Sequence, residues 1–404
     1  MNYIDRLVAE LCPDGVEYRP LGDVVEYAKK REKDGTGVHL YVGVENLKSD
    51  FLGCSPVNGS KGGIIFQKDD ILLGNIRPYL KKMWLSNAEG VSSPDVLVLR
   101  IQENEEENIV AKYLYYILSS SKFVAYNISH SRGGKMPRGN KAKILEFEFP
   151  VPPMEIQEAI VEILDKFTNL EAELEAELEA RTLQYEYYRD SLFEALDCPR
   201  VSLGELGKFY GGLKGKTKND FGSSGARYIS YKNVYENISA DFTWPDFVQV
   251  KEGENQLSLM KGDILLTGSS ENMEEAGLSS VVTKEPEEKA YLNSFSICYR
   301  LNDPSILNPE FSKYLFRSRL ARKQIIRTAQ GVTRFNVSKK KLANVSIPIP
   351  SLEEQQRIVD ILDRFDALTS SLSEGLPAEL AARRSQYEYY RDQLLSFPRK
   401  GDNQ

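Results

Sequence analysis

The heptapeptide QYEYYRD occurs twice in this chain, at residues 184–190 and again at residues 386–392. The two copies lie 202 residues apart in a chain of 404 residues, so the repeating unit is half of the protein. Seven identical residues rich in tyrosine do not arise from composition alone. An internal repeat constrains the fold more strongly than any single predicted element. The sequence therefore predicts two copies of one structural unit.

A long helix is predicted before each heptapeptide, because apolar residues recur there at the alternating spacings of a coiled-coil seam. In the first copy these residues are Ile156, Ile160, Ile163, Phe167, Leu170 and Leu174, and in the second they are Ile358, Ile361, Phe365, Leu368 and Leu372. Prolines at 150 and 152, and at 348 and 350, exclude an earlier helical start. We expect the two helices to pack against each other; the alternative is a core helix in each globular domain. Gly375-Leu-Pro377 is predicted to kink or break the second helix.

The N-terminus resembles the end of the first long helix. Residues 3–7 (YIDRL) resemble residues 188–192 (YRDSL), and in both places a turn and the pair Leu-Gly follow. The N-terminus therefore looks like the end of a repeat that begins at the C-terminus, so that the two units form a circular repeat. This predicts that the termini lie close together and that the long helices run antiparallel.

The segments between the helices also correspond to each other, although their details differ. Strands are expected at 41–46 and 228–233, at 68–73 and 261–266, and at 96–101 and 295–301. Helices are expected to begin at 112–114 and 313–315, and basic polar loops follow at 133–143 and 331–341. The predicted fold class is α+β, a pseudo-two-fold circular repeat of two β-rich domains and two long antiparallel helices. The expected boundaries are 1–150 (with the N-terminal helix), 151–200, 201–350 and 351–404.

Composition excludes several classes of protein. No apolar run of about 18 residues exists, so no membrane span is expected. The N-terminus lacks a basic segment followed by an apolar one, so we expect no signal peptide and a cytoplasmic protein. The four cysteines are scattered, which favours reduced thiols over a zinc site. The net charge is −7, but residues 151–200 hold 13 acidic and 4 basic residues, whereas residues 201–350 hold 16 and 21. A polyanionic partner is therefore expected at the segments between the helices.

Catalytic motifs are weak. The two histidines, His39 and His130, stand in unrelated contexts, which argues against a histidine-based metal site or triad. Residues 211–217 (GGLKGKT) are one residue short of a phosphate loop, and a flexible basic loop is the preferred interpretation. Asp246 with Glu287 and Lys289 could imitate a metal nuclease, but solvated loops explain such short patterns better. The sequence predicts no catalytic residue and no metal ligand.

Binding chemistry is more prominent. Arginine, asparagine and glutamine have the bidentate geometry that suits base edges, and lysine suits phosphates. Side chains of these kinds, with neighbouring tyrosine and threonine, gather in the polar loops, although ordinary surface loops remain the alternative for each of them. The candidate DNA-binding residues are Arg77, Tyr79, Lys81, Lys82, Lys135, Arg138, Asn140, Lys141, Lys214, Lys216, Gln330, Thr333, Arg334, Asn336 and Lys339.

Together, the repeated helices, the proline pairs, the Asp-Ile-Leu-Leu strands (70–73 and 263–266) and Gly-Leu-Pro-Ala-Glu at 375–379 resemble the specificity (S) subunits of type I restriction–modification enzymes. The resemblance covers essentially the whole chain. It implies that each β-rich domain is a target-recognition domain that reads one half of a bipartite, asymmetric sequence in double-stranded DNA. It also implies that this subunit is not catalytic. The alternative function is a coiled-coil scaffold without DNA sequence readout.

The same resemblance implies partners and cofactors. The helices would space the two domains and dock two methyltransferase (M) subunits, with restriction (R) subunits joining that core. S-adenosylmethionine would belong to the M subunits, and ATP and Mg²⁺ to the R subunits, so that no cofactor is expected on this chain. The candidate docking and coil residues are Ile160, Ile163, Phe167, Tyr185, Tyr188, Ile358, Ile361, Phe365, Tyr387 and Tyr390.

Overall fold

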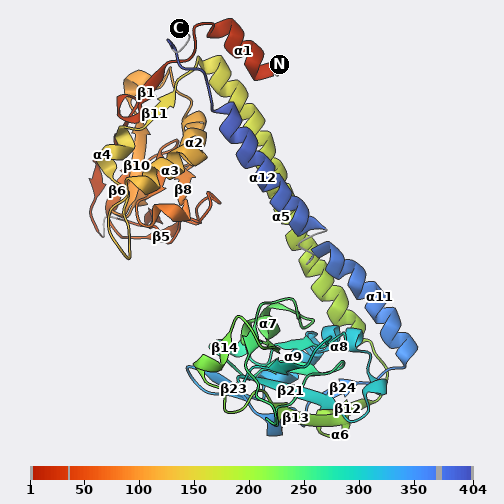
Figure 1. The fold of residues 1–404 in the computed structure, drawn as a ribbon. Coiled ribbons are helices and arrows are strands. Elements are labelled where there is room, and N and C mark those ends of the chain that lie inside the picture. Colours follow the sequence, from red (N-terminus) through yellow and green to blue (C-terminus); the bar gives the residue numbers. More distant parts are fainter. Residues whose placement is uncertain (1–2, 35–36, 370–374, 402–404) are drawn as a thin grey trace. The chain divides into compact units, whose positions relative to one another are not determined.

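The computed structural model describes residues 3–34, 37–369 and 375–401 of the chain. It has a mixed α+β fold with two compact units (Figure 1). Unit 1 comprises Met1–Glu175 and Glu379–Gln404, and unit 2 comprises Ala176–Ala378. Helix α5 (Met154–Glu194) contributes its first part to unit 1 and its second part to unit 2.

Unit 1 contains eleven of the described strands. They are β1 (Tyr18–Pro20), β2 (Val25–Tyr27), β3 (Arg31–Glu32), β4 (His39–Val42), β5 (Val57–Gly59), β6 (Gly63–Phe66), β7 (Ile71–Gly74), β8 (Met83–Leu85), β9 (Gly90–Ser92), β10 (Val96–Ile101) and β11 (Glu148–Pro150). Its helices, besides α5, are α1 (Tyr3–Leu11), η1 (Leu21–Asp23), η2 (Pro78–Leu80), η3 (Glu103–Glu105), α2 (Ala111–Ser119), α3 (Ser121–Ser129), α4 (Lys141–Leu145) and most of α12 (Leu376–Leu394).

Unit 2 contains the remaining described elements. Its strands are β12 (Arg200–Ser202), β13 (Gly207–Gly211), β14 (Phe221–Gly222), β15 (Ala226–Ile229), β16 (Phe247–Val248), β17 (Ile264–Thr267), β18 (Ser269–Ser270), β19 (Ser279–Val281), β20 (Ala290–Leu292), β21 (Ser296–Leu301), β22 (Ala329–Gln330), β23 (Phe335–Val337) and β24 (Ser346–Pro348). Its helices are α6 (Leu203–Leu206), η4 (Lys218–Asp220), α7 (Tyr231–Glu236), η5 (Met273–Glu275), η6 (Pro304–Ile306), α8 (Pro309–Leu315), α9 (Arg319–Ile326), α10 (Lys339–Leu342) and α11 (Leu352–Thr369).

The two units share one sheet topology. Each has a four-stranded antiparallel sheet, in the order β2-β10-β7-β8 in unit 1 and β13-β21-β17-β19 in unit 2. The register also agrees, because Gly74 faces Val96 in unit 1 and Thr267 faces Ser296 in unit 2. A two-strand pair (β1-β11 or β12-β24) and a parallel pair (β4-β9 or β15-β20) recur as well. The repeat found in the sequence is therefore a repeat of the fold.

A buried ion pair occupies the same place in both sheets. Arg100 contacts Asp70 at 2.6 Å in unit 1, and Arg300 contacts Asp263 at 2.6 Å in unit 2. The two carboxylates are 2% and 0% exposed, so each needs the two hydrogen bonds that its arginine donates. The arginines are the last residues but one of the central strands β10 and β21.

Two details of the predicted secondary structure are wrong. The early strands end sooner than expected, at Val42 and Ile229, and residues 231–236 form helix α7. The Ser230 side chain accepts a hydrogen bond from the Asn233 N–H and so caps that helix. The helix expected to begin at residue 313 instead begins at Pro309, whose missing N–H suits the first turn of a helix.

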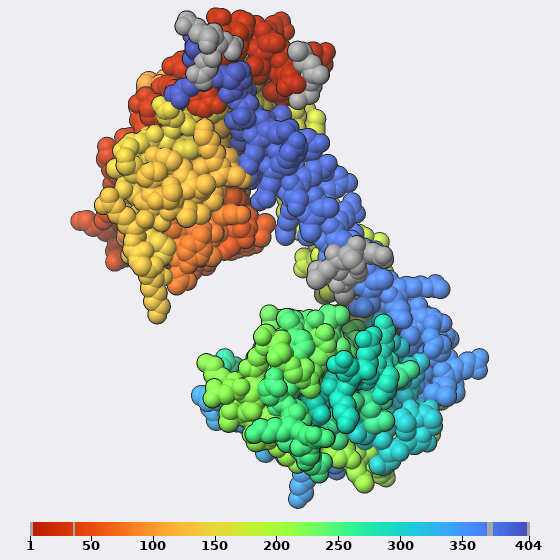
Figure 2. Space-filling model, in the orientation of Figure 1, coloured from red at the N-terminus to blue at the C-terminus, as the bar shows by residue number. Residues whose placement is uncertain are grey.

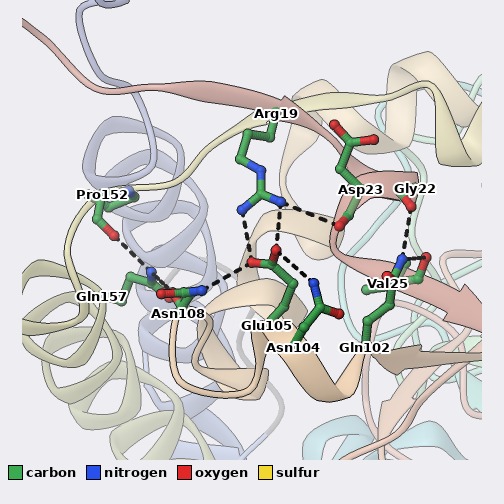
Figure 3. Close-up of polar contacts among 10 residues, drawn as sticks. All are labelled: Arg19, Gly22, Asp23, Val25, Gln102, Asn104, Glu105, Asn108, Pro152 and Gln157. Carbon is green, nitrogen blue, oxygen red and sulfur yellow. Dashed lines mark hydrogen bonds and ion pairs between the residues drawn. The ribbon is translucent and has the colours of Figure 1, made fainter.

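A buried glutamine fixes the start of each long helix. Gln157 is fully buried, and its amide donates to the carbonyls of Asn108 and Pro152, both at 2.8 Å (Figure 3). Its oxygen accepts from the Val110 N–H at 3.0 Å. In unit 2, Gln355 makes the corresponding three bonds. The proline turn is thereby tied to the loop before α2 or α8, which explains why this residue type recurs in both halves.

The apolar seam of α5 has two roles in unit 1. Ile156, Ile160 and Leu164 are buried in the core of the unit, so this part behaves as a core helix. One turn later, Phe167 stacks on Tyr390 of α12, with 5.6 Å between the ring centroids. Arg384 of α12 pairs with carboxylates further along α5, so the two helices run antiparallel there. The sequence left two alternatives, a core helix and a helix packed against the other long helix. Each describes one part of α5.

Unit 2 repeats this arrangement with α11. Ile358 and Leu362 belong to the core, and Phe365 stacks on Tyr188 of α5 at 5.5 Å. The predicted break in the second long helix is confirmed, because α11 ends at Thr369 and α12 begins at Leu376. The predicted seam residue Leu372 lies outside the described residues.

The two ends of the described chain meet in unit 1, as the circular repeat predicts. The Val16 N–H donates to the Pro398 carbonyl, and the Lys400 N–H donates to the Val16 carbonyl, both at 2.9 Å. Figure 2 shows the red N-terminal part and the blue C-terminal part in contact there. Across the described ranges, no helix combines the length and apolar character needed to span a membrane.

Candidate nucleic-acid interface

Two polar loops that are distant in the sequence pair in each unit. In unit 1, Ile76 bridges to Arg138, which also bridges to Arg132; we call residues 75–77 and 132–138 the first ribbon. In unit 2, β18 pairs with β23, which also pairs with β22; we call residues 268–270 and 329–337 the second ribbon. Ser269 faces Asn336 as Ile76 faces Arg138, so the ribbons are equivalent. Each ribbon combines the loop after the central Leu-Leu strand with the basic loop, a pairing that the sequence did not reveal.

The first ribbon presents basic side chains. Lys135 and Arg138 are exposed, and Arg138 donates to Asp95 at 3.2 Å. Arg77 is half-buried and its backbone is left-handed at φ +52°, while its N–H donates to the Pro137 carbonyl. Beside the ribbon, Tyr79 is 50% exposed on η2.

The second ribbon exposes side chains of other types. Gln330, Thr333, Arg334 and Asn336 are all exposed. In the described ranges, neither Arg334 nor Asn336 has a side-chain hydrogen bond or an ion pair. Arginine and asparagine are the residues with bidentate complements on guanine and adenine. Lys339 is exposed at the start of α10, as Lys141 is at the start of α4.

Several other candidates have structural partners. Lys81 lies 3.6 Å from Asp50 and 4.0 Å from Glu388, and the Lys82 ammonium donates to the Val44 carbonyl at 2.8 Å. The Asn140 side chain caps α4 by accepting from two backbone N–H groups. Lys216 forms an ion pair with Glu254 at 2.6 Å and its side chain is only 5% exposed, so it is not free to meet a ligand, whereas Lys214 is exposed.

Two half-buried arginines bind backbone carbonyls of helix α7, strand β19 and the segment that follows β18. Arg317 donates to the carbonyls of Ser279, Val234 and Tyr235. Arg322 donates to the carbonyls of Gly277, Glu274 and Ala276. Burial lowers the pKa of both guanidiniums to about 10. Charge-assisted bonds of this kind fix the backbone beside the second ribbon.

Residues 211–217 lead into a three-residue 3-10 helix, whereas a phosphate loop opens an α-helix. Within residues 3–34, 37–369 and 375–401, no group of three or more His, Cys, Asp or Glu side chains is placed to hold a metal ion.

The QYEYYRD heptapeptides divide into an inner and an outer face. Tyr185 and Tyr387 are half-buried, and burial raises the pKa of each to about 12. Asp190 accepts from the N–H of Arg319, at the start of α9, and Asp392 accepts from the N–H of Ser121, at the start of α3. The outer face consists of Tyr187 in unit 2 and Tyr389 in unit 1, which are 70% and 59% exposed. Tyr188 and Tyr390 lie between the two faces, because they are 43% and 39% exposed while they stack on Phe365 and Phe167.

The remaining docking candidates lie deeper. Ile160 and Ile358 are fully buried in the cores, and Ile163, Ile361, Phe167 and Phe365 are half-buried. Sequence reasoning missed the capping role of Asp190 and Asp392, although their recurrence was a signal. It also missed Asp95 and Phe295, which differ between the halves and left no signal.

Comparison with known proteins decides the family. The model of the type I restriction modification DNA specificity domain matches the chain twice, at residues 13–180 and 197–382. The chain belongs to the type I restriction–modification specificity subunits. It is 30% identical to the specificity subunit of an Escherichia coli type I restriction enzyme, over 99% of this chain and 98% of the relative. A specificity subunit from Methanocaldococcus jannaschii is 22% identical over 88% of this chain and 87% of the relative.

A solved structure has the same fold. A chain from a study of complex assembly and conformational transition in the type I restriction–modification system superposes with a TM-score of 0.64 at 18% identity. The superposition covers 96% of this chain and 98% of that chain. As a type I specificity subunit, the protein is a non-catalytic component with two target recognition domains.

Proposed function

We propose that each unit reads one half of a bipartite, asymmetric DNA sequence through its ribbon. The observation that carries this proposal is the pair of equivalent ribbons with different exposed side chains. A frame that is copied while its exposed polar residues differ suits two readers of different sequences. Exposed lysines beside each ribbon, Lys141 and Lys339, supply charge for phosphates.

The modified DNA sequence tests this proposal. The chain, expressed with its methyltransferase partner, is expected to modify one split motif that sequencing of methylated DNA identifies. Arg334→Ala is expected to cost roughly 1–3 kcal/mol on that motif and less on random DNA, because a base contact is lost. Arg327→Ala, an exposed arginine outside the ribbon, is the matched control. Unmodified DNA, or modification without a motif, would contradict the reading of sequence.

The outer tyrosine faces of the two heptapeptides are proposed to dock two copies of one partner. The identity of the two faces favours this, because a partner bound twice needs the same surface twice. Tyrosine is also a residue type enriched at interfaces. We assign the two partner copies to methyltransferase subunits, with restriction subunits joining the complex. The acidic character of α5 assigns DNA to the ribbons and not to this helix.

The double variant Tyr187→Ala/Tyr389→Ala tests the docking surface. It is expected to fold, since both side chains are mostly exposed, but to lose assembly with the methyltransferase subunit in size-exclusion chromatography. Thr182→Ala, on the same helix, is the control. Retained assembly would remove these tyrosines from the interface.

No cofactor is proposed for this chain. S-adenosylmethionine would be bound by the methyltransferase subunits, and ATP and Mg²⁺ by the restriction subunits, in the cytoplasm. The alternative function, a scaffold without sequence readout, predicts that ribbon substitutions leave the modified motif unchanged. The four functional segments, 1–150, 151–200, 201–350 and 351–404, belong to the same proposal, in which the first and third read DNA.

A further inference from the structure

A backbone turn that precedes the central strand occupies the same position in both units. Its residue types differ between the units. The turn at residues 93–96 precedes β10, and the turn at residues 293–296 precedes β21. The Asn75 N–H donates to the Asp95 carbonyl, and the Gly268 N–H donates to the Phe295 carbonyl, both at 2.9 Å. Asp95 and Phe295 are therefore equivalent, and each lies beside its ribbon.

In unit 1 the turn residue contacts a ribbon residue directly. The Arg138 guanidinium donates to the Asp95 carboxylate at 3.2 Å, while both side chains remain about half exposed. A carboxylate that binds one edge of a guanidinium restricts its rotamers and leaves its other N–H groups available. Arg138 is thus an exposed, partly oriented donor.

In unit 2 the equivalent pair is Phe295 and Asn336. Gly268 joins these positions, because its N–H binds the Phe295 carbonyl and its own carbonyl accepts from the N–H of Val337, the residue after Asn336, at 2.9 Å. A Cβ atom on Gly268 would lie 2.4 Å from the Phe295 oxygen, so the close approach requires glycine. Asn336 is exposed and, in the described part of the chain, has no side-chain partner.

Hydrogen bonds hold the backbone of the exposed phenylalanine. Phe295 is 66% exposed, yet its N–H donates to the Asn293 side chain at 2.9 Å. Asn293 is itself buried and donates to the Ile229 carbonyl and to Ser296. A single exposed apolar side chain needs no explanation in general. Here, however, the exposed phenylalanine and an asparagine without a side-chain partner occupy the positions at which the other unit has the ion pair of Asp95 and Arg138.

We infer that Asp95 with Arg138 in unit 1, and Phe295 with Asn336 in unit 2, each specify one base pair in one half of the target. This inference rests on the proposed function. Arg138, oriented by Asp95, reads guanine of a G·C pair in the half bound by unit 1. Asn336 reads adenine of an A·T pair in the half bound by unit 2, and Phe295 packs on the thymine methyl group. Bidentate arginine–guanine and asparagine–adenine contacts, and apolar contact with the thymine methyl, are the complements of these side chains in the major groove.

The experiment compares the motif modified by the chain and its methyltransferase partner with the motifs of two variants. Phe295→Ala is expected to reduce discrimination for A·T at one position of one half by about tenfold, with all other positions retained. The double variant Phe295→Asp/Asn336→Arg is expected to change that same position to G·C. Met260→Ala is the control, because Met260 is 39% exposed and precedes β17 at the end opposite Gly268.

Three outcomes overturn the inference. These are a wild-type half without an A·T pair at the affected position, an unaltered motif in Phe295→Ala, or a change in both halves at once. If the double variant modifies no DNA, Phe295→Ala decides the question alone, because truncation of an exposed side chain leaves the core intact. A wild-type complex without any sequence preference would instead contradict the proposed function.

Discussion

Gln157 shows how one side chain can preserve a fold while its surroundings diverge. It is fully buried at the start of α5 and completes three backbone hydrogen bonds, and Gln355 does the same at the start of α11. No shorter or apolar side chain can satisfy two carbonyls and an N–H at once. The residue is therefore fixed by backbone chemistry and not by DNA.

Gln157→Met is expected to lower the free energy of unfolding of unit 1 by roughly 2–4 kcal/mol, because buried backbone groups lose their partners. Urea denaturation followed by circular dichroism measures the change. Glu158→Met, the exposed neighbour on the same helix, is the control and should change little. Equal midpoints for the two variants would contradict the role given to Gln157.

Lys141 is exposed at the start of α4, and we proposed that it contacts DNA phosphates. Lys141→Ala is expected to weaken binding to target and random DNA alike and to reduce the salt dependence by about one phosphate contact. Lys166→Ala, on the acidic helix α5, should leave both unchanged. Fluorescence anisotropy at several salt concentrations gives the slopes. A loss confined to the target sequence would assign Lys141 to base contact instead.

At the scale of elements, the long helices and central strands could be predicted from the sequence because each has a simple period or an exact copy. The strand predicted at residues 228–233 failed in its second part, because a local hydrogen bond that the Asn233 N–H donates to the Ser230 side chain overrides the strand propensity of Tyr231. The ion pair of Lys216 could not be predicted for a different reason. Its burial against Glu254 depends on two loops 38 residues apart, which no local pattern encodes. The ribbons likewise could not be predicted, because each forms when two loops that are distant in the sequence pair.

The capping aspartates link two elements within each unit. Asp190 of α5 accepts from the first N–H of α9 at 2.8 Å, where a carboxylate also meets the positive end of the helix dipole. Asp190→Ala is expected to destabilise unit 2 by about 1 kcal/mol. Asp197→Ala, an exposed carboxylate after the same helix, is the control. Identical thermal unfolding of the two variants would show that the cap contributes nothing.

At the scale of the whole molecule, the copied frame predicts that the recognition domains can be exchanged. Arg200 faces Pro348 across the β12-β24 pair, so the two ends of segment 201–350 lie side by side. Replacing residues 201–350 with the equivalent segment of a relative is expected to change one half of the modified motif and retain the other. Sequencing of methylated DNA gives the result. A simultaneous change of both halves would show that the units do not read independently.

The length of α5 gives the last prediction. Residues 170–181 read LEAE, LEAE and LEAR, a tetrapeptide repeated along the helix. Four added residues lengthen a helix by ~6 Å and rotate it by ~400°, which is one turn plus ~40°. One base pair of B-DNA rotates by ~35° and advances by ~3.4 Å, so the rotation corresponds to one added base pair and the rise to nearly two.

The rotation should determine how many base pairs are added to the spacer, because each ribbon must face its groove in the DNA. A small axial shift can be absorbed by bending. Insertion of one more LEAE is therefore expected to keep both half-sequences and to lengthen the unread spacer by one base pair, two at most. Replacing one LEAE with LKAE, which keeps the length, is the control and should leave the spacer unchanged. An unchanged spacer in a fully active insertion variant would mean that α5 does not set the distance between the two half-sequences.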